Sequence, residues 1–231
     1  MVETPEIVTK DLIKVYRAGK SEVIALRGLD MQVGDGELVA LQGPSGCGKT
    51  TLLNLIGGID RPTAGSVVVD GTNVADMSDA DLVSYRRDRV GFVFQFFNLV
   101  PTLSAEENIE LPMRLAGKPS ELREKRTRGL LQLVGLEKRA VHRPDELSGG
   151  EQQRVAIAVA LANDPPIVLA DEPTGELDTK TGEEILALFR RLNGELRKTV
   201  LVVTHDARVA GIAHRVLQIQ DGKIVGEAAR N

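Results

Sequence analysis

The most constraining feature of the chain is a glycine-rich segment at residues 43–50, Gly-Pro-Ser-Gly-Cys-Gly-Lys-Thr. It fits the pattern G-x-x-x-x-G-K-[ST], in which backbone N–H groups surround phosphate oxygens, the lysine reaches the terminal phosphates and the last hydroxyl can hold Mg²⁺. An apolar run, Leu38–Leu41, precedes the segment, and a stretch with helical character, Thr50–Gly57, follows it. Strand, loop and helix are the context that this pattern requires, so the segment predicts a phosphate-binding loop.

The competing interpretation of residues 43–50 is an ordinary glycine-rich turn that matches the pattern by chance. The position of Lys49 argues against it. The helix dipole disfavours a cation at the start of a helix unless an anion is bound nearby.

Four apolar runs are each followed by residue types suited to phosphate chemistry. The pairs are 38–41 with the glycine loop, 90–94 with Gln95, 167–170 with Asp171 and Glu172, and 200–203 with Thr204 and His205. Continuous apolar runs that alternate with helices predict a parallel sheet buried on both faces. Because ligands of such sheets bind beyond the carboxyl ends of the strands, the four runs predict one shared site.

The two acids at the end of the third run suggest separate tasks. Asp171 would face Mg²⁺, usually through water, and Glu172 would polarise an attacking water molecule. The plain alternatives are a pair of solvated acids and, for His205, a histidine that only completes a strand end. His142 and His214 have no comparable setting and are expected to be structural.

The segment Leu147–Glu151, Leu-Ser-Gly-Gly-Glu, begins a strongly helical run that continues through Gln152–Ala162. Ser148 and Glu151 have the spacing of a capping box, which satisfies the first backbone donors of a helix. Two glycines in a first turn cost about 1 kcal/mol each relative to alanine. The pair Gly149 and Gly150 therefore suggests a helix N-terminus whose backbone meets an anionic ligand in addition to being capped.

The remaining organisation is read from short patterns. Strands are expected at Ile7–Val15, Met31–Val33 and Ser66–Val69, and a helix is expected at 182–195. Residues from about 102 to 160 carry helix formers and charge, with Glu121–Leu136 as the clearest amphipathic segment. The sequence thus predicts an α/β fold with a helical insertion.

Composition limits the possible partners and surroundings. The formal net charge is −4, which implies no general affinity for nucleic acid. One cysteine rules out an internal disulfide and fits a reducing compartment. No apolar run approaches the roughly 20 residues needed to span a bilayer, and the acidic start lacks the apolar core of a secretion signal. Any work at a membrane would therefore use a separate chain.

Taken together, these segments resemble the ATPase subunits of ATP-binding-cassette (ABC) systems over nearly the whole chain and in the family's motif order. The matching segments are Walker A (43–50), the Q-loop (Gln95), the signature (147–151), Walker B (167–172), the D-loop (175–178) and the switch histidine (His205). The resemblance implies a single ABC ATPase domain over 1–231, with a RecA-like P-loop NTPase core, an antiparallel β subdomain and a helical subdomain at about 102–160.

The resemblance also implies roles for individual residues, with ATP and Mg²⁺ as cofactors. The catalytic set is Glu172, His205, Gln95 and Lys49, and the metal set is Thr50, Gln95 and Asp171. Tyr16 would stack on adenine, while Ser148 and Gly150 would contact the γ-phosphate of a second subunit. The full nucleotide-binding set is Tyr16, Gly43, Pro44, Ser45, Gly46, Cys47, Gly48, Lys49, Thr50, Thr51, Ser148, Gly149, Gly150 and Glu151.

Residues 91–103, Gly-Phe-Val-Phe-Gln-Phe-Phe-Asn-Leu-Val-Pro-Thr-Leu, look like the lipoprotein-release, macrolide-export and cell-division exporter-like group. That similarity implies a head-to-tail homodimer with ATP at the interface, an integral membrane permease as partner and no nucleic acid. It implies a cytoplasmic location on the inner face of the cell membrane. The alternative is a regulatory ATPase of a cell-division-type membrane complex that moves no cargo.

A third possibility, a chromosome-maintenance or translation ATPase of the same superfamily, fits poorly. Such chromosome proteins place long coiled coils between the two motifs, and such translation factors carry two cassettes. This chain has neither feature and no basic patch.

Two positions depart from the family pattern: Val159 replaces the usual arginine, and Glu176 stands where alanine or asparagine is common.

The expectation for the phenylalanines follows from strand alternation. Phe92 and Phe94 alternate within a strand and are expected to be core. Phe96 and Phe97 follow Gln95, so at least one of them is expected at a surface groove that contacts the permease.

Overall fold

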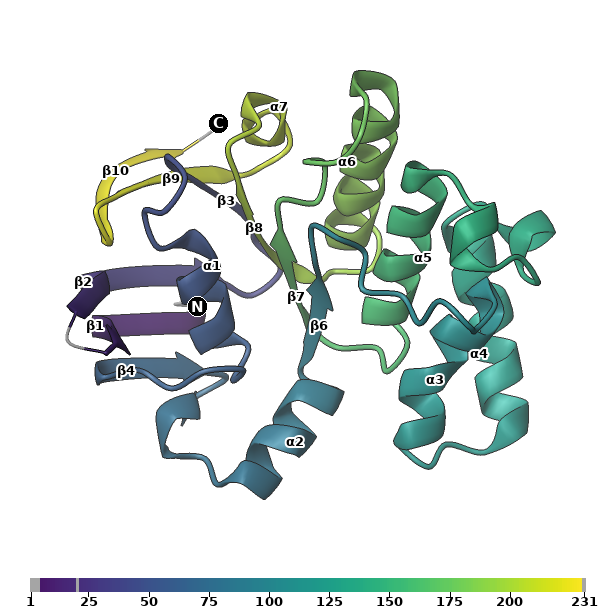
Figure 1. Cartoon of the computed structure of the whole chain (residues 1–231), viewed down its shortest axis with the longest axis horizontal. Coiled ribbons are helices and arrows are strands. Elements are labelled where there is room, and N and C mark those ends of the chain that lie inside the picture. The colour runs from purple at the N-terminus through teal and green to yellow at the C-terminus, as the bar shows by residue number, and fades with distance from the viewer. Residues whose placement is uncertain (1–4, 20, 230–231) are drawn as a thin grey trace.

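A six-stranded sheet forms the centre of the molecule (Figure 1). The structure is a computed structural model that describes residues 5–19 and 21–229. The strand order is β10-β9-β3-β8-β7-β6, and all strands are parallel except β10, which pairs antiparallel with β9. The strands are β3 (Leu38–Gln42), β6 (Val90–Val93), β7 (Ile167–Asp171), β8 (Thr199–Thr204), β9 (Arg215–Gln220) and β10 (Lys223–Ala229).

The predicted parallel sheet is confirmed, and its four predicted strands are adjacent. Strands β3, β8, β7 and β6 are consecutive neighbours, so their carboxyl ends meet at one edge. Every residue of β8 is buried, as is every residue of β7 except Asp171 at its end. Such burial explains why these strands read as continuous apolar runs. The strand at 90 ends at Val93, one residue earlier than expected.

A second, antiparallel sheet has the order β2-β1-β4-β5. Its strands are β1 (Pro5–Ala18), β2 (Ser21–Gly34), β4 (Ala64–Val69) and β5 (Thr72–Asn73). The two long strands extend beyond the predicted 7–15 and 31–33. The first four residues of β2 are exposed, so this part of the strand lacks the alternation of apolar and polar residues by which a half-buried strand is recognised.

One helix lies between the two sheets and a second follows the antiparallel sheet (Figure 1). Helix α1 (Lys49–Ile56) contacts β7 and β8 of the central sheet and β2 and β4 of the other. Its buried side chains include Leu52, Leu53, Leu55 and Ile56, which pack into the core between the sheets. Helix α2 (Asp79–Asp88) begins with a capping box at Ser78 and packs beside β6.

The opposite side of the central sheet is covered by helices. They are α3 (Ala105–Leu115), α4 (Ser120–Leu133), α5 (Gly149–Ala160) and α6 (Thr179–Gly194), with the short α7 (Ala207–Ala210) near β8. Single 3₁₀ turns lie at Val74–Asp76, Glu137–Arg139 and Pro144–Glu146. Helices α3, α4 and α5 group together away from the antiparallel sheet (Figure 1).

Alternation along the strands divides the core into two apolar clusters. In β3, Leu38 and Ala40 join the cluster formed with α3–α6, while Val39 and Leu41 join the cluster formed with α1 and the antiparallel sheet. This is the pattern of a strand whose successive side chains point to opposite faces. None of the helices in the described ranges is long and apolar enough to cross a membrane.

Candidate active site

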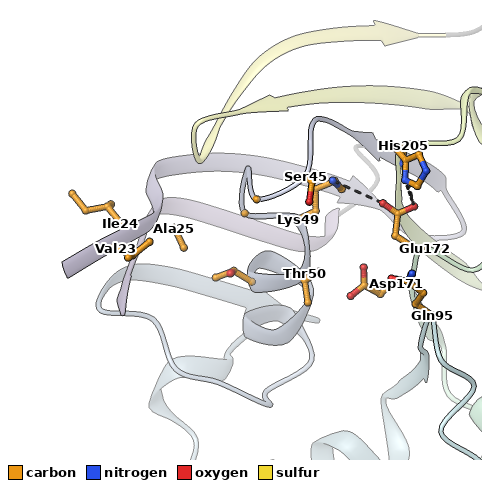
Figure 2. A pocket seen from close by; sticks show the side chains of 13 residues that line it. Val23, Ile24, Ala25, Ser45, Lys49, Thr50, Gln95, Asp171, Glu172 and His205 are labelled. Atoms are coloured by element: carbon orange, nitrogen blue, oxygen red, sulfur yellow. Dashed lines mark hydrogen bonds and ion pairs between the residues drawn. The ribbon is translucent and has the colours of Figure 1, made fainter. Parts of the chain in front are cut away.

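An open cleft of about 650 Å³ lies at the carboxyl edge of the central sheet (Figure 2). A volume of this size is within the range of small-molecule and cofactor sites. The cleft gathers residues from the glycine loop, α1 and the ends of β6, β7 and β8, as the strand pattern predicts. The predicted site residues that line it are Ser45, Gly46, Gly48, Lys49, Thr50, Thr51, Gln95, Asp171, Glu172 and His205.

The glycine loop turns back on itself so that α1 points its N-terminus into the cleft. Gly48, the residue that caps α1, has φ 105°, and Gly46 has φ 78°, both in the region that side chains disfavour. A Cβ at Gly48 would lie only 2.5 Å from the carbonyl oxygen of Ala25. No side chain caps α1 and no acid lies in its first turn, so the helix presents backbone N–H groups suited to an anion.

Lys49 is buried, yet its ammonium group faces the cleft. Its Nζ donates hydrogen bonds to the carbonyl oxygens of Gly43 (2.9 Å) and Pro44 (3.1 Å). It also lies 3.9 Å from Oε1 of Glu172 (Figure 2). A buried lysine held by two carbonyls and a carboxylate is positioned to exchange one of these partners for phosphate oxygens.

Glu172 is paired with His205, the predicted switch histidine. Its Oε2 accepts one hydrogen bond, from the backbone N–H of His205 at 3.1 Å, and lies 3.0 Å from Nδ1 of the same histidine. The Glu172 side chain is only 14% exposed, whereas that of His205 is 73% exposed. Glu172 has φ 45°, a rare backbone conformation for glutamate.

The three predicted metal ligands offer oxygen atoms, which are the ligands that Mg²⁺ prefers. Burial raises the pKa of Asp171, although a hydrogen bond from the Thr50 hydroxyl lowers it, while the nearby charge of Glu172 raises it and that of Lys49 lowers it. No group of three or more His, Cys, Asp and Glu side chains arranged to hold a metal occurs within 5–19 and 21–229. The donor set therefore suits Mg²⁺ held together with phosphate oxygens and water.

Gln95 lines the cleft but is engaged with the D-loop. Its Nε2 donates a hydrogen bond to Oε1 of Glu176 at 2.8 Å. Glu176 is the residue that departs from the family pattern, so this contact is a consequence of that departure. Val159, the other departure, lies on α5 and is half-buried against the helical-side cluster.

Outside the segment Ser148–Glu151, four predicted binding residues do not line the cleft. Gly43, Pro44 and Cys47 belong to the loop, and Cys47 is buried beneath it with 5% exposure. Tyr16 is 39% exposed, its hydroxyl donates to Asp60 at 3.0 Å, and the Lys14 Nζ lies 4.9 Å from the centre of its ring. Its stacking on adenine stays a prediction.

Sequence reasoning missed one wall of the cleft. Val23, Ile24 and Ala25 of β2 line the end away from Glu172 (Figure 2). Val23 and Ile24 are exposed, and Val23 pairs directly with Tyr16 across the antiparallel sheet. Prediction of β2 as a full hairpin partner of β1 would have placed these apolar residues next to Tyr16.

The segment Ser148–Glu151 does not line this cleft. It forms the start of α5, where Ser148 and Glu151 complete the predicted capping box. A Cβ at Gly150 would overlap the Thr181 methyl group of α6, whereas one at Gly149 would make only ordinary contacts. Close packing of α5 on α6 is therefore a reason for Gly150 that needs no ligand, and contact of the two glycines with an anion stays a prediction.

Of the four phenylalanines near Gln95, the two in or beside β6 stack on each other with ring centres 4.6 Å apart. Phe92 and Phe94 are half-buried, not fully buried as expected of core. Phe96 is 69% exposed, in agreement with the expectation that at least one of the later pair reaches the surface. Phe97 is half-buried, and its ring lies near Gly149.

Comparison with known proteins agrees with this arrangement. The family described as ABC transporter matches residues 26–175. A protein of Thermotoga maritima described as an uncharacterized ABC transporter ATP-binding protein is 54% identical over 216 residues, 94% of this chain and 92% of its own. A macrolide export ATP-binding/permease protein of Paracoccus denitrificans is 46% identical, and the match covers 98% of this chain but 34% of that protein.

Among solved structures, the chain is similar to a dimeric ATP-binding cassette described as a post-hydrolysis state bound to ADP and Pi. The TM-score is 0.90 at 46% identity, and the match covers 97% of this chain and 99% of the other. A second dimeric ABC transporter cassette matches with a TM-score of 0.91 at 47% identity, with the same coverage. The expected fold class, an ABC-type α/β core with an antiparallel β part and helices, is therefore confirmed.

Proposed function

The chain belongs to the ABC transporter family and is an ABC ATPase, and we propose that it is the ATP-hydrolysing subunit of a membrane transport complex. The observation that carries the proposal is the convergence of Lys49, Glu172 and His205 at one sheet edge, directly beside the N-terminus of α1. These groups are the ones that triphosphate binding and attack by water require.

The chain's own groups supply the steps of hydrolysis. The N–H groups of the loop and Lys49 hold the phosphates. Glu172 accepts a hydrogen bond from the attacking water and polarises it, and His205, 3.0 Å away, holds that water and the terminal phosphate in place.

Thr50, Gln95 and Asp171 would hold Mg²⁺ with the nucleotide. When bound there, the ion would supply positive charge against the phosphate oxygens. Asp171 lies at the end of a rigid buried strand, and its desolvated carboxylate gains a counter-charge when the ion binds. Gln95 would offer its side-chain carbonyl oxygen, while its Nε2 donates to Glu176.

A head-to-tail homodimer completes the site. Ser148 and Gly150 do not line the cleft of their own chain, so a second copy would bring them to the triphosphate. One chain carries both half-sites, which makes two identical copies the simplest assembly. The dimeric cassettes with which this chain shares its fold support this arrangement.

The partner would be an integral membrane permease that converts ATP-driven closure of the dimer into movement across the membrane. The support is the similarity to macrolide export proteins described as ATP-binding/permease proteins. The ATPase would then lie on the cytoplasmic face of the membrane, held there by the permease. Export or mechanical transmission is the expected mode, with no nucleic acid involved.

The test is ATP hydrolysis by the purified chain, followed by its use as bait for membrane proteins in detergent-solubilised membranes of the source cells. We expect Mg²⁺-dependent hydrolysis that changes rate in the complex. A chain that hydrolyses ATP but binds no membrane protein would overturn the transport assignment and leave the ATPase assignment intact.

A further inference from the structure

Glu151 places a negative charge in the segment that would approach the triphosphate of a second copy. Its Oε2 accepts hydrogen bonds from the backbone N–H and the hydroxyl of Ser148, both at 2.9 Å. The backbone hydrogen bond from Ser148 is the main cause of a lowered pKa for this carboxyl group, so Glu151 is ionised at neutral pH. Its side chain is 18% exposed.

This charge creates an electrostatic difficulty for ATP binding across a dimer. A carboxylate and a triphosphate repel each other, and water screens a largely covered carboxylate poorly. The Ser148 hydroxyl also donates a hydrogen bond to Glu151, and this bond must break before the hydroxyl can donate to a phosphate oxygen.

Arg139, a cation outside α5, forms an ion pair with Glu151. It comes from the 3₁₀ turn at Glu137–Arg139, and its Nε donates a hydrogen bond to Oε1 of Glu151 at 3.0 Å. Ser148 binds one carboxylate oxygen and Arg139 the other. Arg154, the cation on the next turn of α5, is engaged with Glu184 of α6 at 2.9 Å.

We propose that Arg139 is a positioning residue for ATP hydrolysis: it neutralises Glu151 through the second carboxylate oxygen, so that the charge of Glu151 does not oppose binding of Ser148 to the triphosphate held by a second copy of the chain. The proposal rests on the head-to-tail dimer proposed above. Arginine suits the task because it stays charged and its planar group fixes the direction of the Nε hydrogen bond.

The test measures ATP-dependent dimerisation in a Glu172→Gln parent, in which slow hydrolysis preserves the ATP-bound state. Arg139→Ala in this parent is expected to raise the dimer dissociation constant about fivefold, the size of a partly exposed ion pair. Glu151→Gln added to Arg139→Ala should restore the parent value. A glutamine keeps the acceptor for the Ser148 N–H while removing the charge that Arg139 balances.

Lys138→Ala is the matched control, because Lys138 is an exposed neighbour of Arg139 in the same turn and its loss changes net charge equally. It should dimerise like the parent. Melting temperatures of all variants are measured in parallel. Dimerisation defects that Glu151→Gln does not rescue, or that Lys138→Ala shares, would overturn the role of Arg139.

The outcomes separate this proposal from the one on which it rests. A parent that stays monomeric with ATP removes the dimer and the Arg139 proposal together. A parent that dimerises as well with Arg139→Ala as without it removes only the Arg139 proposal.

Discussion

At the scale of single residues, the charged side chains of the cleft contact one another and the loop backbone, and we expect a bound nucleotide to change these contacts. Lys49 is held by the carbonyl oxygens of Gly43 and Pro44 and lies 3.9 Å from Glu172. Glu172 in turn faces His205. Each of these groups has a partner within the protein, and we expect a bound nucleotide to take the place of some of these partners.

Lys49→Ala should reduce ATP hydrolysis by about 100-fold or more, because a preorganised donor to the phosphates is lost. The fold should survive, since the lysine side chain ends at the cleft. ATPase rate and melting temperature are the measurements. Lys223→Ala, an exposed lysine of β10, is the control and should hydrolyse ATP normally. Near-normal turnover of Lys49→Ala would contradict the assigned site.

Asp171→Asn should abolish Mg²⁺-dependent hydrolysis without lowering the melting temperature at neutral pH. Burial raises the pKa of Asp171, so the folded protein binds more protons there than the unfolded chain. The free energy of unfolding should consequently fall as pH rises through the titration of this group, and the variant should lack that contribution. Thermal melts of both proteins between pH 4 and 7 test this, and a variant that melts lower throughout the range would refute it.

At the scale of elements, α5 is fixed against α6 by close packing. Gly150 lies against the Thr181 methyl, and Arg154 bridges to Glu184. Gln153 is fully buried and donates a hydrogen bond of 3.0 Å to the carbonyl oxygen of Pro173, the residue that follows Glu172 in the chain. The segment that would meet a partner's nucleotide is thus connected to the loop that carries Glu172, the glutamate proposed to be catalytic.

Gly150→Ala should destabilise the protein by about 1–3 kcal/mol, because the new methyl group overlaps Thr181. Thr181→Ser removes that methyl group and should restore most of the melting temperature in the double variant. ATP-driven dimerisation of the double variant then distinguishes two roles of Gly150. Full recovery of dimerisation would show that packing alone requires the glycine, and a remaining defect would indicate contact with the nucleotide.

Phe96→Ser should leave folding and basal ATPase activity unchanged but weaken association with the permease. The side chain is 69% exposed and follows Gln95, which lines the cleft, so a partner there would be close to the nucleotide. Co-purification with the permease is the measurement. Val225→Ser, which alters a 60% exposed valine on β10, is the control. Equal loss of association in both variants would argue against a specific surface at Phe96.

At the scale of the whole molecule, the two halves of the expected site lie on different parts of one chain. The phosphate loop is beside the antiparallel sheet, and α5 is on the opposite side of the central sheet (Figure 1). Closure of the site by rotation within one chain would require α5 to leave α6. Association of two chains requires no such change.

Glu172→Gln should bind ATP, hydrolyse it about 10²–10⁴-fold more slowly and form a stable dimer, because loss of the general base stalls the chemical step. Light scattering with and without ATP gives the mass, and ADP serves as the negative control. A mass that stays that of one chain at saturating ATP would contradict the homodimer.

The sequence by itself determined the local parts of this protein. The glycine loop, the capping box at Ser148 and the buried strands depend on residues that are neighbours along the chain. They could therefore be predicted from the sequence. The convergence of Gln95, Asp171, Glu172 and His205 also followed, since parallel strands share a carboxyl edge. The first part of β2, and with it Val23 and Ile24, was missed because these residues are exposed and carry no strand periodicity.

Only the tertiary structure decided contacts between segments that are distant in sequence. It showed that Gly150 is required by Thr181, that Gln95 is bound by Glu176 and that Arg139 pairs with Glu151. Such pairings depend on the relative placement of loops and helices, which is set by packing in the two apolar clusters on either side of the sheet. Spacing along the chain carries no information about that placement, because the side chains meet only after the clusters have formed.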